Sequence, residues 1–98
     1  MTLTDAQREY LRVLGHSLEP VVEVGAGGLT HSLAKTVQRA LDDHGLVKVR
    51  VRFGDREKRS RVLAQLAPLA DVCLVQEPCH CALLYRPSPR ASIRLPPN

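Results

Sequence analysis

The segment 46–53 alternates between apolar and basic side chains from Val47 onward, and this pattern limits the possible folds more than any other. Its apolar positions hold valines and Phe53, and the positions between them hold Lys48, Arg50 and Arg52. Successive side chains of a strand point to opposite faces. The alternation therefore predicts a strand with one buried face and one basic face.

A second strand and an amphipathic helix precede this segment. Residues 21–24 are apolar apart from one glutamate, and Pro20 breaks the chain before them. The following apolar residues recur at the spacing of one buried helix face: Leu33, Val37, Ala40 and Leu41. Thr30 or Ser32 can cap this helix, and Gly45 can end it. Two strands that flank a helix predict a βαβ unit with parallel strands and a right-handed crossover.

The N-terminal segment predicts another helix. Thr4 and Gln7 have the spacing of a capping box, which places the helix over residues 5–16, and Gly15 stands where it should end. The predicted apolar stripe consists of Ala6, Tyr10, Leu11, Leu14 and then Leu18.

The C-terminal half predicts a third helix and a β-hairpin. Asp55 can cap the helix, and Pro68 should end or kink it near Ala67 because proline removes a backbone hydrogen bond. Its core face is expected to comprise Val62, Leu63, Leu66 and Leu69 or Ala70. Segments 72–76 and 80–86 then form the two strands of the hairpin.

The element order is therefore α-β-α-β-α-β-β. With 98 residues, we expect one domain over 1–98, of the α/β (α+β) class, with a four-stranded mixed sheet and three packed helices. Residues 87–98 contain four prolines, so we expect this tail to run extended over the surface.

Composition narrows the classes of function. The net charge is +4, and 44% of residues are hydrophobic, which favours a globular protein with a polyanionic partner. No apolar run is long enough to span a bilayer. The N-terminus lacks the pattern of a signal peptide, so we expect a cytoplasmic location and no membrane partner.

Three cysteines, Cys73, Cys79 and Cys81, surround His80 and raise the question of a metal. If residues 77–80 form the hairpin turn, Cys73 and Cys81 lie on opposite faces of the sheet. Structural zinc normally requires two closely spaced ligand pairs. We therefore expect reduced thiols and neither a metal nor another cofactor.

The loop Gly25-Ala26-Gly27-Gly28 joins the first strand to the second helix. A glycine loop that opens a helix offers backbone N–H groups to an anion such as phosphate. The Lys-Ser/Thr of a nucleotide P-loop is absent, and Thr30 stands where a dinucleotide fingerprint needs its third glycine. The remaining pattern is Gly-x-x-Gly, which clamps nucleic-acid backbone in KH domains. A tight strand-to-helix turn explains the same glycines equally well.

Basic residues also gather at the start of the third helix. Arg56, Lys58, Arg59 and Arg61 oppose the helix dipole there, although Glu57 can pair with Arg61. The cluster fits either a phosphate-binding role or a solvated charged face. Further positive charge lies in the tail at Arg86, Arg90 and Arg94.

Aromatic and catalytic residues are scarce. Phe53, Tyr10 and Tyr85 all fit core positions, so the stacking platform typical of many single-strand binders is missing. This favours recognition of structured RNA through its backbone. The histidines are scattered, and only His31 lies beside the glycine loop. We therefore expect no enzyme and no small-molecule substrate.

Several stretches together resemble the CRM domain (chloroplast RNA splicing and ribosome maturation) in its stand-alone bacterial, YhbY-type form. They are Leu3-Thr4 with the first helix, 18–22, 24–30, 46–49, 55–57, 84–87 and 93–96. The resemblance implies an αβαβαββ fold similar to the C-terminal domain of bacterial translation initiation factor three. It also implies RNA binding through the Gly-x-x-Gly loop and association with precursors of the large ribosomal subunit.

The expected RNA-contacting residues combine the loop with the basic residues around it. They are Gly25, Ala26, Gly27, Gly28, Thr30, His31, Lys35, Lys48, Arg50, Arg52, Arg56, Lys58 and Arg59. The family often has a basic or polar residue in place of Ala26, so this loop would bind through main-chain amides. The family's hairpin turn usually has a glycine where Cys79 stands.

Two functions therefore remain open at the level of sequence. The first is a non-enzymatic RNA-binding factor in large-subunit assembly. The second is an adaptor that docks on an acidic protein partner and needs no RNA. An enzyme that binds a small phosphate compound is a distant third, because it requires a titrating residue beside Gly28 and only His31 is available.

Overall fold

The computed structural model describes residues 3–25, 27–52, 56–76, 81–90 and 93–96. Its elements are α1 (Asp5–His16), β1 (Pro20–Val24), α2 (His31–His44), β2 (Leu46–Val51), α3 (Arg56–Leu66), the short 3-10 helix η1 (Ala67–Leu69), β3 (Val72–Gln76) and β4 (Cys81–Tyr85). The predicted order α-β-α-β-α-β-β is confirmed, with η1 added after α3.

The strands form one mixed sheet in the order β1-β2-β4-β3. β1 and β2 run parallel and α2 connects them, as the βαβ prediction requires. β4 lies antiparallel to both β2 and β3. Cys73 pairs with Leu84 and Gln76 pairs with Cys81, which is the predicted hairpin register.

One face of the sheet carries the larger core, beneath α2 and α3. The valines of β2 lie here, as their alternation predicts. They pack with the buried residues Val22, Val24, Val37, Leu41, Val62, Leu66, Ala82 and Leu84. The helical periodicities of α2 and α3 thus identify the correct buried faces.

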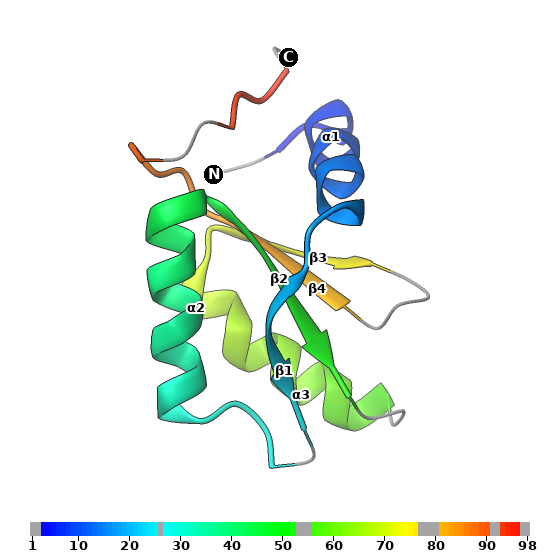
Figure 1. Cartoon of the computed structure of the whole chain (residues 1–98). Helices are drawn as coiled ribbons and strands as arrows, with labels where there is room; N and C mark the ends of the chain where they lie inside the picture. The colour runs from blue at the N-terminus through cyan, green and yellow to red at the C-terminus, as the bar shows by residue number, and fades with distance from the viewer. Residues whose placement is uncertain (1–2, 26, 53–55, 77–80, 91–92, 97–98) are drawn as a thin grey trace.

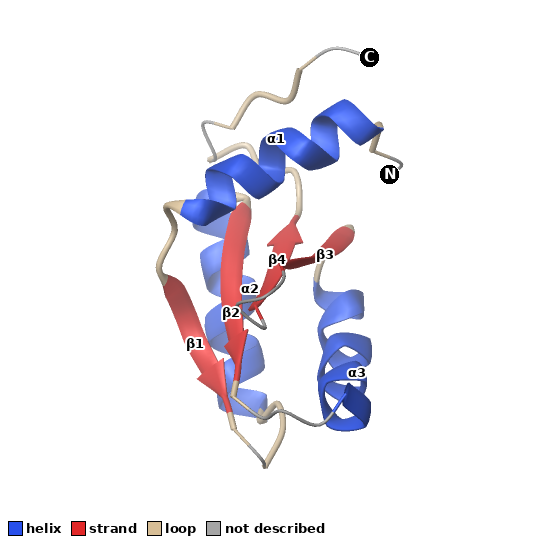
Figure 2. Ribbon diagram, turned by 90° about the vertical axis from the view of Figure 1, so that its right-hand side faces the viewer, coloured by secondary structure: helices blue, strands red, loops and turns tan. Residues whose placement is uncertain are grey.

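The opposite face carries a smaller core beneath α1. Leu3 and Leu11 pack there against Leu46, Leu74, Leu83 and Tyr85. Both faces of β2 are therefore covered along much of the strand, whereas the sequence predicts one buried face and one basic face. In Figures 1 and 2, α1 and both chain ends lie at the upper end of the molecule, opposite the loop between β1 and α2.

The predicted range of α1, residues 5–16, is confirmed, but two other predictions about this helix are wrong. Gly15 does not cap its end, because the helix continues to His16 and Ser17 is the cap. A methyl group at position 15 would lie 2.5 Å from Leu83 Cδ1, so the glycine lets the helix approach the sheet. The predicted apolar stripe is also too wide, because Ala6, Tyr10 and Leu18 are exposed.

Local capping explains where the helices begin and end. Thr4 and Gln7 form the predicted capping box of α1. Gly45 ends α2 in a left-handed conformation, with φ of 76°. The α-helical part of α3 ends at Leu66, and Pro68 lies in the following 3-10 turn. The predicted cap Asp55 lies outside the described residues.

The described part of the tail is packed more closely than its proline content suggests. Ile93 and Leu95 contact the smaller core. Gln7 Nε2 donates a hydrogen bond of 3.0 Å to the carbonyl of Pro96. Within the described residues, no helix combines the length and apolarity needed to cross a bilayer.

Candidate functional site

The glycine loop and the N-termini of α2 and α3 lie at the carboxyl end of the parallel strands. Val24 and Val51 pair near the ends of β1 and β2. From there the chain leads through residues 25–30 into α2, and after β2 it leads into α3. Figure 1 shows the glycine loop and the starts of both helices at the lower end of the molecule. Ligands of α/β sheets commonly bind at this end of parallel strands.

The glycine loop closes through its own backbone. The N–H of Gly28 donates a hydrogen bond of 2.9 Å to the carbonyl of Gly25, and Gly28 has a φ of 81°. That conformation favours glycine because it lacks a Cβ atom. One glycine of the loop therefore serves the turn, and its N–H is not available to an external phosphate.

Gly25 takes part in this turn through its carbonyl, but no described neighbour occupies the side-chain positions of Gly25 and Gly27. Among the described glycines, only Gly28 and Gly45 have a positive φ. A Cβ atom added to Gly25 or Gly27 would meet nothing within 4 Å, and both residues are exposed. The missing side chains leave bare backbone facing open space, where another molecule can approach closely. Ala26 lies outside the described residues.

The start of α2 supplies free hydrogen-bond donors beside this loop. Thr30 Oγ1 accepts a hydrogen bond of 3.1 Å from the N–H of Leu33, so Thr30 is the cap. The first intrahelical bond runs from Ala34 to the carbonyl of Thr30. The N–H groups of His31 and Ser32 precede that bond and point out of the helix end. The first turn contains no acidic residue, which suits an anion at the positive end of the helix dipole.

The two side chains of this helix that are predicted to contact RNA are both exposed. His31 is the first residue of α2, and Lys35 lies in its second turn. Their positions leave them open to solvent beside the loop. Five of the predicted RNA-contacting residues therefore lie on the glycine loop and the first two turns of α2. They are Gly25, Gly27, Thr30, His31 and Lys35.

The basic stripe predicted on β2 is not one continuous surface. Lys48 is buried with 8% of its surface exposed. Its Nζ donates to the carbonyl of Leu18 at 3.5 Å, which is its only partner among the described residues. Lys48 is therefore removed from the candidate site, because α1 and its connection to β1 cover this part of the strand.

Arg50 and Arg52 remain exposed, but both pair with an acidic residue of the neighbouring strand. Glu23 lies 3.5 Å from Arg50 Nη1 and 3.0 Å from Arg52 Nη1. The parallel register places Glu23 directly opposite Arg50. The pairing of Glu23 with these arginines was not predicted from the sequence. The signal was present, because Glu23 is the one acidic residue of the predicted neighbouring strand.

The start of α3 carries the third basic group. Arg56 and Lys58 are exposed and Arg59 is half-buried. Glu57 pairs with Arg61 at 3.0 Å, as their i, i+4 spacing predicts. Arg56 and Arg59 also line a pocket between this helix and the sheet. A Cβ atom at Gly28 would lie 3.9 Å from Gln65 Oε1, so the glycine loop lies beside the last turn of α3 and not beside its basic first turn.

The tail arginines have structural partners. Arg86 donates hydrogen bonds to the carbonyls of Leu69 and Gln38 and forms an ion pair with Asp42. Arg90 pairs with Asp43 at 3.2 Å. These contacts tie the chain after β4 to α2 and η1, and Asp42 and Asp43 offset the positive charge of these two arginines.

The aromatic and cysteine predictions are partly confirmed. Tyr85 is buried, whereas Tyr10 has 37% of its surface exposed and is not a core residue. Phe53 lies outside the described residues, as do Cys79 and His80. Cys73 and Cys81 lie on opposite faces of the sheet, as predicted. The described residues contain no group of three or more potential metal ligands, and burial raises the pKa of the Cys73 thiol.

Comparisons with known proteins give matches over most of this chain. Residues 3–86 match the CRS1 / YhbY (CRM) domain. A Haemophilus influenzae protein named as RNA-binding is 38% identical over 95 residues, which cover 97% of this chain and 96% of that protein. A Pseudomonas aeruginosa protein named a probable RNA-binding protein is 36% identical over 95 residues, covering 97% and 91% of the two chains.

The fold has a solved counterpart. The solution structure of a hypothetical Staphylococcus aureus protein, proposed to bind RNA, matches with a TM-score of 0.78 at 29% identity. The match covers 97% of this chain and 100% of that one. On the sequence match and the shared fold together, this chain belongs to the CRS1/YhbY (CRM) domain family.

Proposed function

We propose that this protein binds RNA through the end of the molecule that carries the glycine loop, the start of α2 and the start of α3. The observation that carries this proposal is the open space around Gly25 and Gly27, where an added Cβ atom would meet none of the described atoms within 4 Å. The names of its relatives support RNA as the partner.

In this proposal an RNA phosphate approaches the bare backbone of the loop. The N–H groups of His31 and Ser32 donate to it, because they come before the first hydrogen bond of α2. Lys35 on one side and Arg56 with Lys58 on the other supply positive charge to adjacent phosphates. The loop thus contributes close approach, and the helix end contributes the donors.

Arg50 and Arg52 contribute to RNA binding only if a phosphate replaces Glu23 as their partner. Both already pair with Glu23, so an approaching phosphate competes with that carboxylate. These ion pairs are exposed and each contributes little to stability, about 0–1 kcal/mol. An RNA backbone that offers several phosphates can therefore displace Glu23 without unfolding the sheet.

We further propose ribosomal RNA of the large-subunit precursor as the target, with the protein acting in the cytoplasm as an assembly factor without catalysis. Support for this finer assignment comes from the family resemblance of the loop and the flanking segments. The scattered histidines support a binding role, since His31 is exposed and has no catalytic partner among the described residues.

The test is a double substitution in the loop, Ala26→Asp with Gly27→Asp. Two carboxylates at the site of phosphate approach should reduce affinity for in vitro transcribed large-subunit ribosomal RNA at least tenfold in a filter-binding assay. The control is Ala6→Asp with Val13→Asp, which adds the same charge at two exposed positions of α1. If the two double variants lose affinity equally, the loop is not the binding site.

The competing adaptor function makes a different prediction for native complexes. If RNA mediates association, the protein should co-sediment with large-subunit precursors and lose them after ribonuclease treatment. Persistence of all partners after complete RNA digestion would favour a protein-docking adaptor and contradict the RNA proposal.

A further inference from the structure

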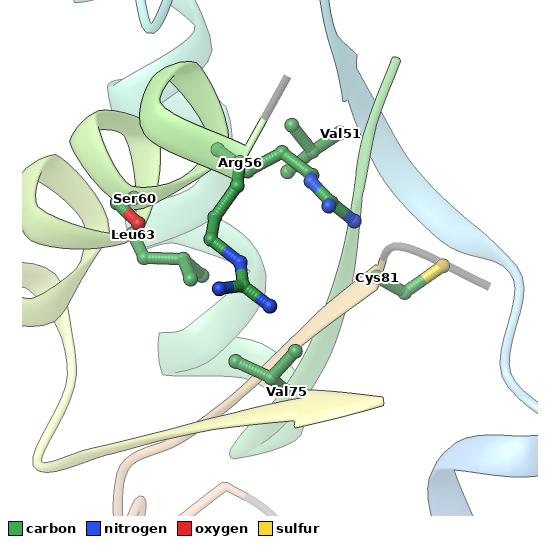
Figure 3. A pocket seen from close by; sticks show the side chains of 7 residues that line it. Val51, Arg56, Ser60, Leu63, Val75 and Cys81 are labelled. Atoms are coloured by element: carbon green, nitrogen blue, oxygen red, sulfur yellow. The ribbon is translucent and has the colours of Figure 1, made fainter. Parts of the chain in front are cut away.

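A pocket of about 450 Å³ opens between α3 and the sheet, beside the start of the helix. Figure 3 shows Arg56, Ser60 and Leu63 entering it from the helix, with Val51, Val75 and Cys81 on the strands opposite. Arg59 completes the lining. This volume lies within the range of small-ligand sites, roughly 300–1,000 Å³.

The lining combines an apolar floor with two guanidinium groups. Val51 and Leu63 belong to the larger core or pack against it. Val75, on the edge strand β3, has 41% of its surface exposed and so offers the pocket an accessible apolar side chain. Arg56 and Arg59 add planar cations that can stack on a flat ring or bind a phosphate.

These features match the chemistry of one nucleotide. The base of a nucleotide has flat apolar faces that suit Val51, Leu63 and Val75, and the phosphate of the nucleotide suits an arginine. Unstacked bases of RNA are held on arginine planes as well as on aromatic rings. A chain with three aromatic residues in all therefore has an alternative to an aromatic platform.

The pocket is also correctly placed for this role. Val51 in its wall pairs across the sheet with Val24, the residue before Gly25. Adjacent strands lie about 4.8 Å apart. The pocket therefore begins one strand away from the loop at which the RNA backbone is proposed to bind.

We infer that this pocket receives a single unstacked nucleotide of the bound RNA, so that the protein prefers RNA with a bulged or looped base beside a helix. The inference rests on the proposed RNA-binding function and adds a base subsite to it. The loop and the start of α2 hold the backbone, while the α3 pocket holds one base by stacking and apolar contact.

The experiment compares a fully paired RNA hairpin with four hairpins that each carry one bulged nucleotide, A, G, C or U. Stacking of a base on protein side chains contributes roughly 1–3 kcal/mol. We expect the best bulged hairpin to bind at least fivefold more tightly than the paired one. Replacing its bulged nucleotide by an abasic residue should remove the preference.

A matched pair of variants locates the effect in the pocket. Val75→Asp places a carboxylate at the pocket wall, and Val21→Asp makes the same change on the other edge strand, where Val21 is 39% exposed. Val75→Asp should abolish the preference for the bulge. Val21→Asp should retain it, and circular dichroism should confirm that both variants are folded.

A second pair separates stacking from charge. Arg56→Lys keeps the positive charge but removes the planar guanidinium, so it should lower affinity for the bulged hairpin by a larger factor than affinity for the paired hairpin. Arg61→Lys is the control, because Arg61 lies on the same helix and does not line the pocket.

The outcomes of these experiments test the nucleotide pocket separately from the proposed RNA-binding function. If the loop variants lose RNA affinity but bulged and paired hairpins bind equally, the nucleotide pocket is wrong and RNA binding stands. If the preference survives Val75→Asp, the base lies elsewhere and the inference is again overturned. If no hairpin and no ribosomal RNA binds, the proposed function itself fails.

Discussion

The two ends of this molecule use the same residue types for opposite purposes. At the α1 end, Gly15 is pressed against Leu83 and Lys48 is buried against the carbonyl of Leu18. At the loop end, Gly25 and Gly27 face open space, and Arg56 is exposed. Glycine and basic residues serve packing at one end and remain available to a partner at the other. Residue type alone therefore does not identify a binding site.

The largest expected effect comes from one substitution made at both ends. Gly15→Leu should destabilise the protein by about 3 kcal/mol, because overpacking a close helix–sheet contact typically costs 1–3 kcal/mol or more. Gly27→Leu should change stability by less than about 0.5 kcal/mol, as surface substitutions usually do. Urea unfolding followed by circular dichroism measures the free energy of unfolding of both variants. Equal losses would contradict the claim that only Gly15 is required for packing.

The substitution at Gly27, which should barely change stability, should instead lower RNA affinity. Gly27→Leu fills the open space beside the loop and should weaken binding to large-subunit ribosomal RNA about tenfold, a loss of about 1.4 kcal/mol. Its control is Val13→Leu, an enlargement at an exposed position of α1. Unchanged affinity in the Gly27 variant would show that the loop does not approach RNA.

The basic residues of β2 offer a smaller contrast within one strand. Lys48→Met removes a buried ammonium whose only described partner is 3.5 Å away, so stability should stay the same or rise by about 1 kcal/mol. RNA affinity should not change. Arg52→Met should instead reduce the slope of log affinity against log salt, by roughly 0.9 if it contacts one duplex phosphate.

These two substitutions sharpen the assignment of the RNA-binding face. An identical salt slope for wild type and the Arg52 variant would remove this sheet face from the interface. A reduced slope for the Lys48 variant would contradict its burial beneath α1.

The smallest expected effect concerns alkaline pH. Burial raises the pKa of Cys73 above its ordinary value of about 9, so the folded protein holds this proton more tightly than the unfolded chain. The resulting stabilisation is complete below pH 9 and declines as pH rises through the higher pKa of the folded state. Unfolding at pH 8 and pH 10 should therefore show a smaller decline for Cys73→Val than for wild type.

Much of this fold follows from local sequence patterns, because capping residues and apolar periodicity act within a few positions. Thr4 with Gln7, Gly45 and Pro68 correctly place helix ends. The alternation of β2 correctly identifies its valine face. The burial of Lys48 could not be predicted from that alternation, since it depends on α1 covering the second face of the sheet.

The candidate site was only partly predictable from the sequence, because it too depends on contacts between elements that are distant in the chain. Spacing identifies the loop, but it does not show that Gly28 serves the turn while Gly25 and Gly27 face open space. The pairing of Glu23 with Arg50 and Arg52 requires the register of two strands. The pocket beside α3 requires Val51 and Val75 to come together from distant parts of the sequence.

The most direct test is an NMR titration of the labelled protein with large-subunit ribosomal RNA fragments, with backbone amide shifts followed residue by residue. We predict the largest shifts at Gly25, Gly27, His31 and Ser32, with further shifts at the start of α3. Residues of α1 and the tail after Pro87 should change little. Largest shifts in α1 with an unperturbed glycine loop would contradict the assignment of the binding end.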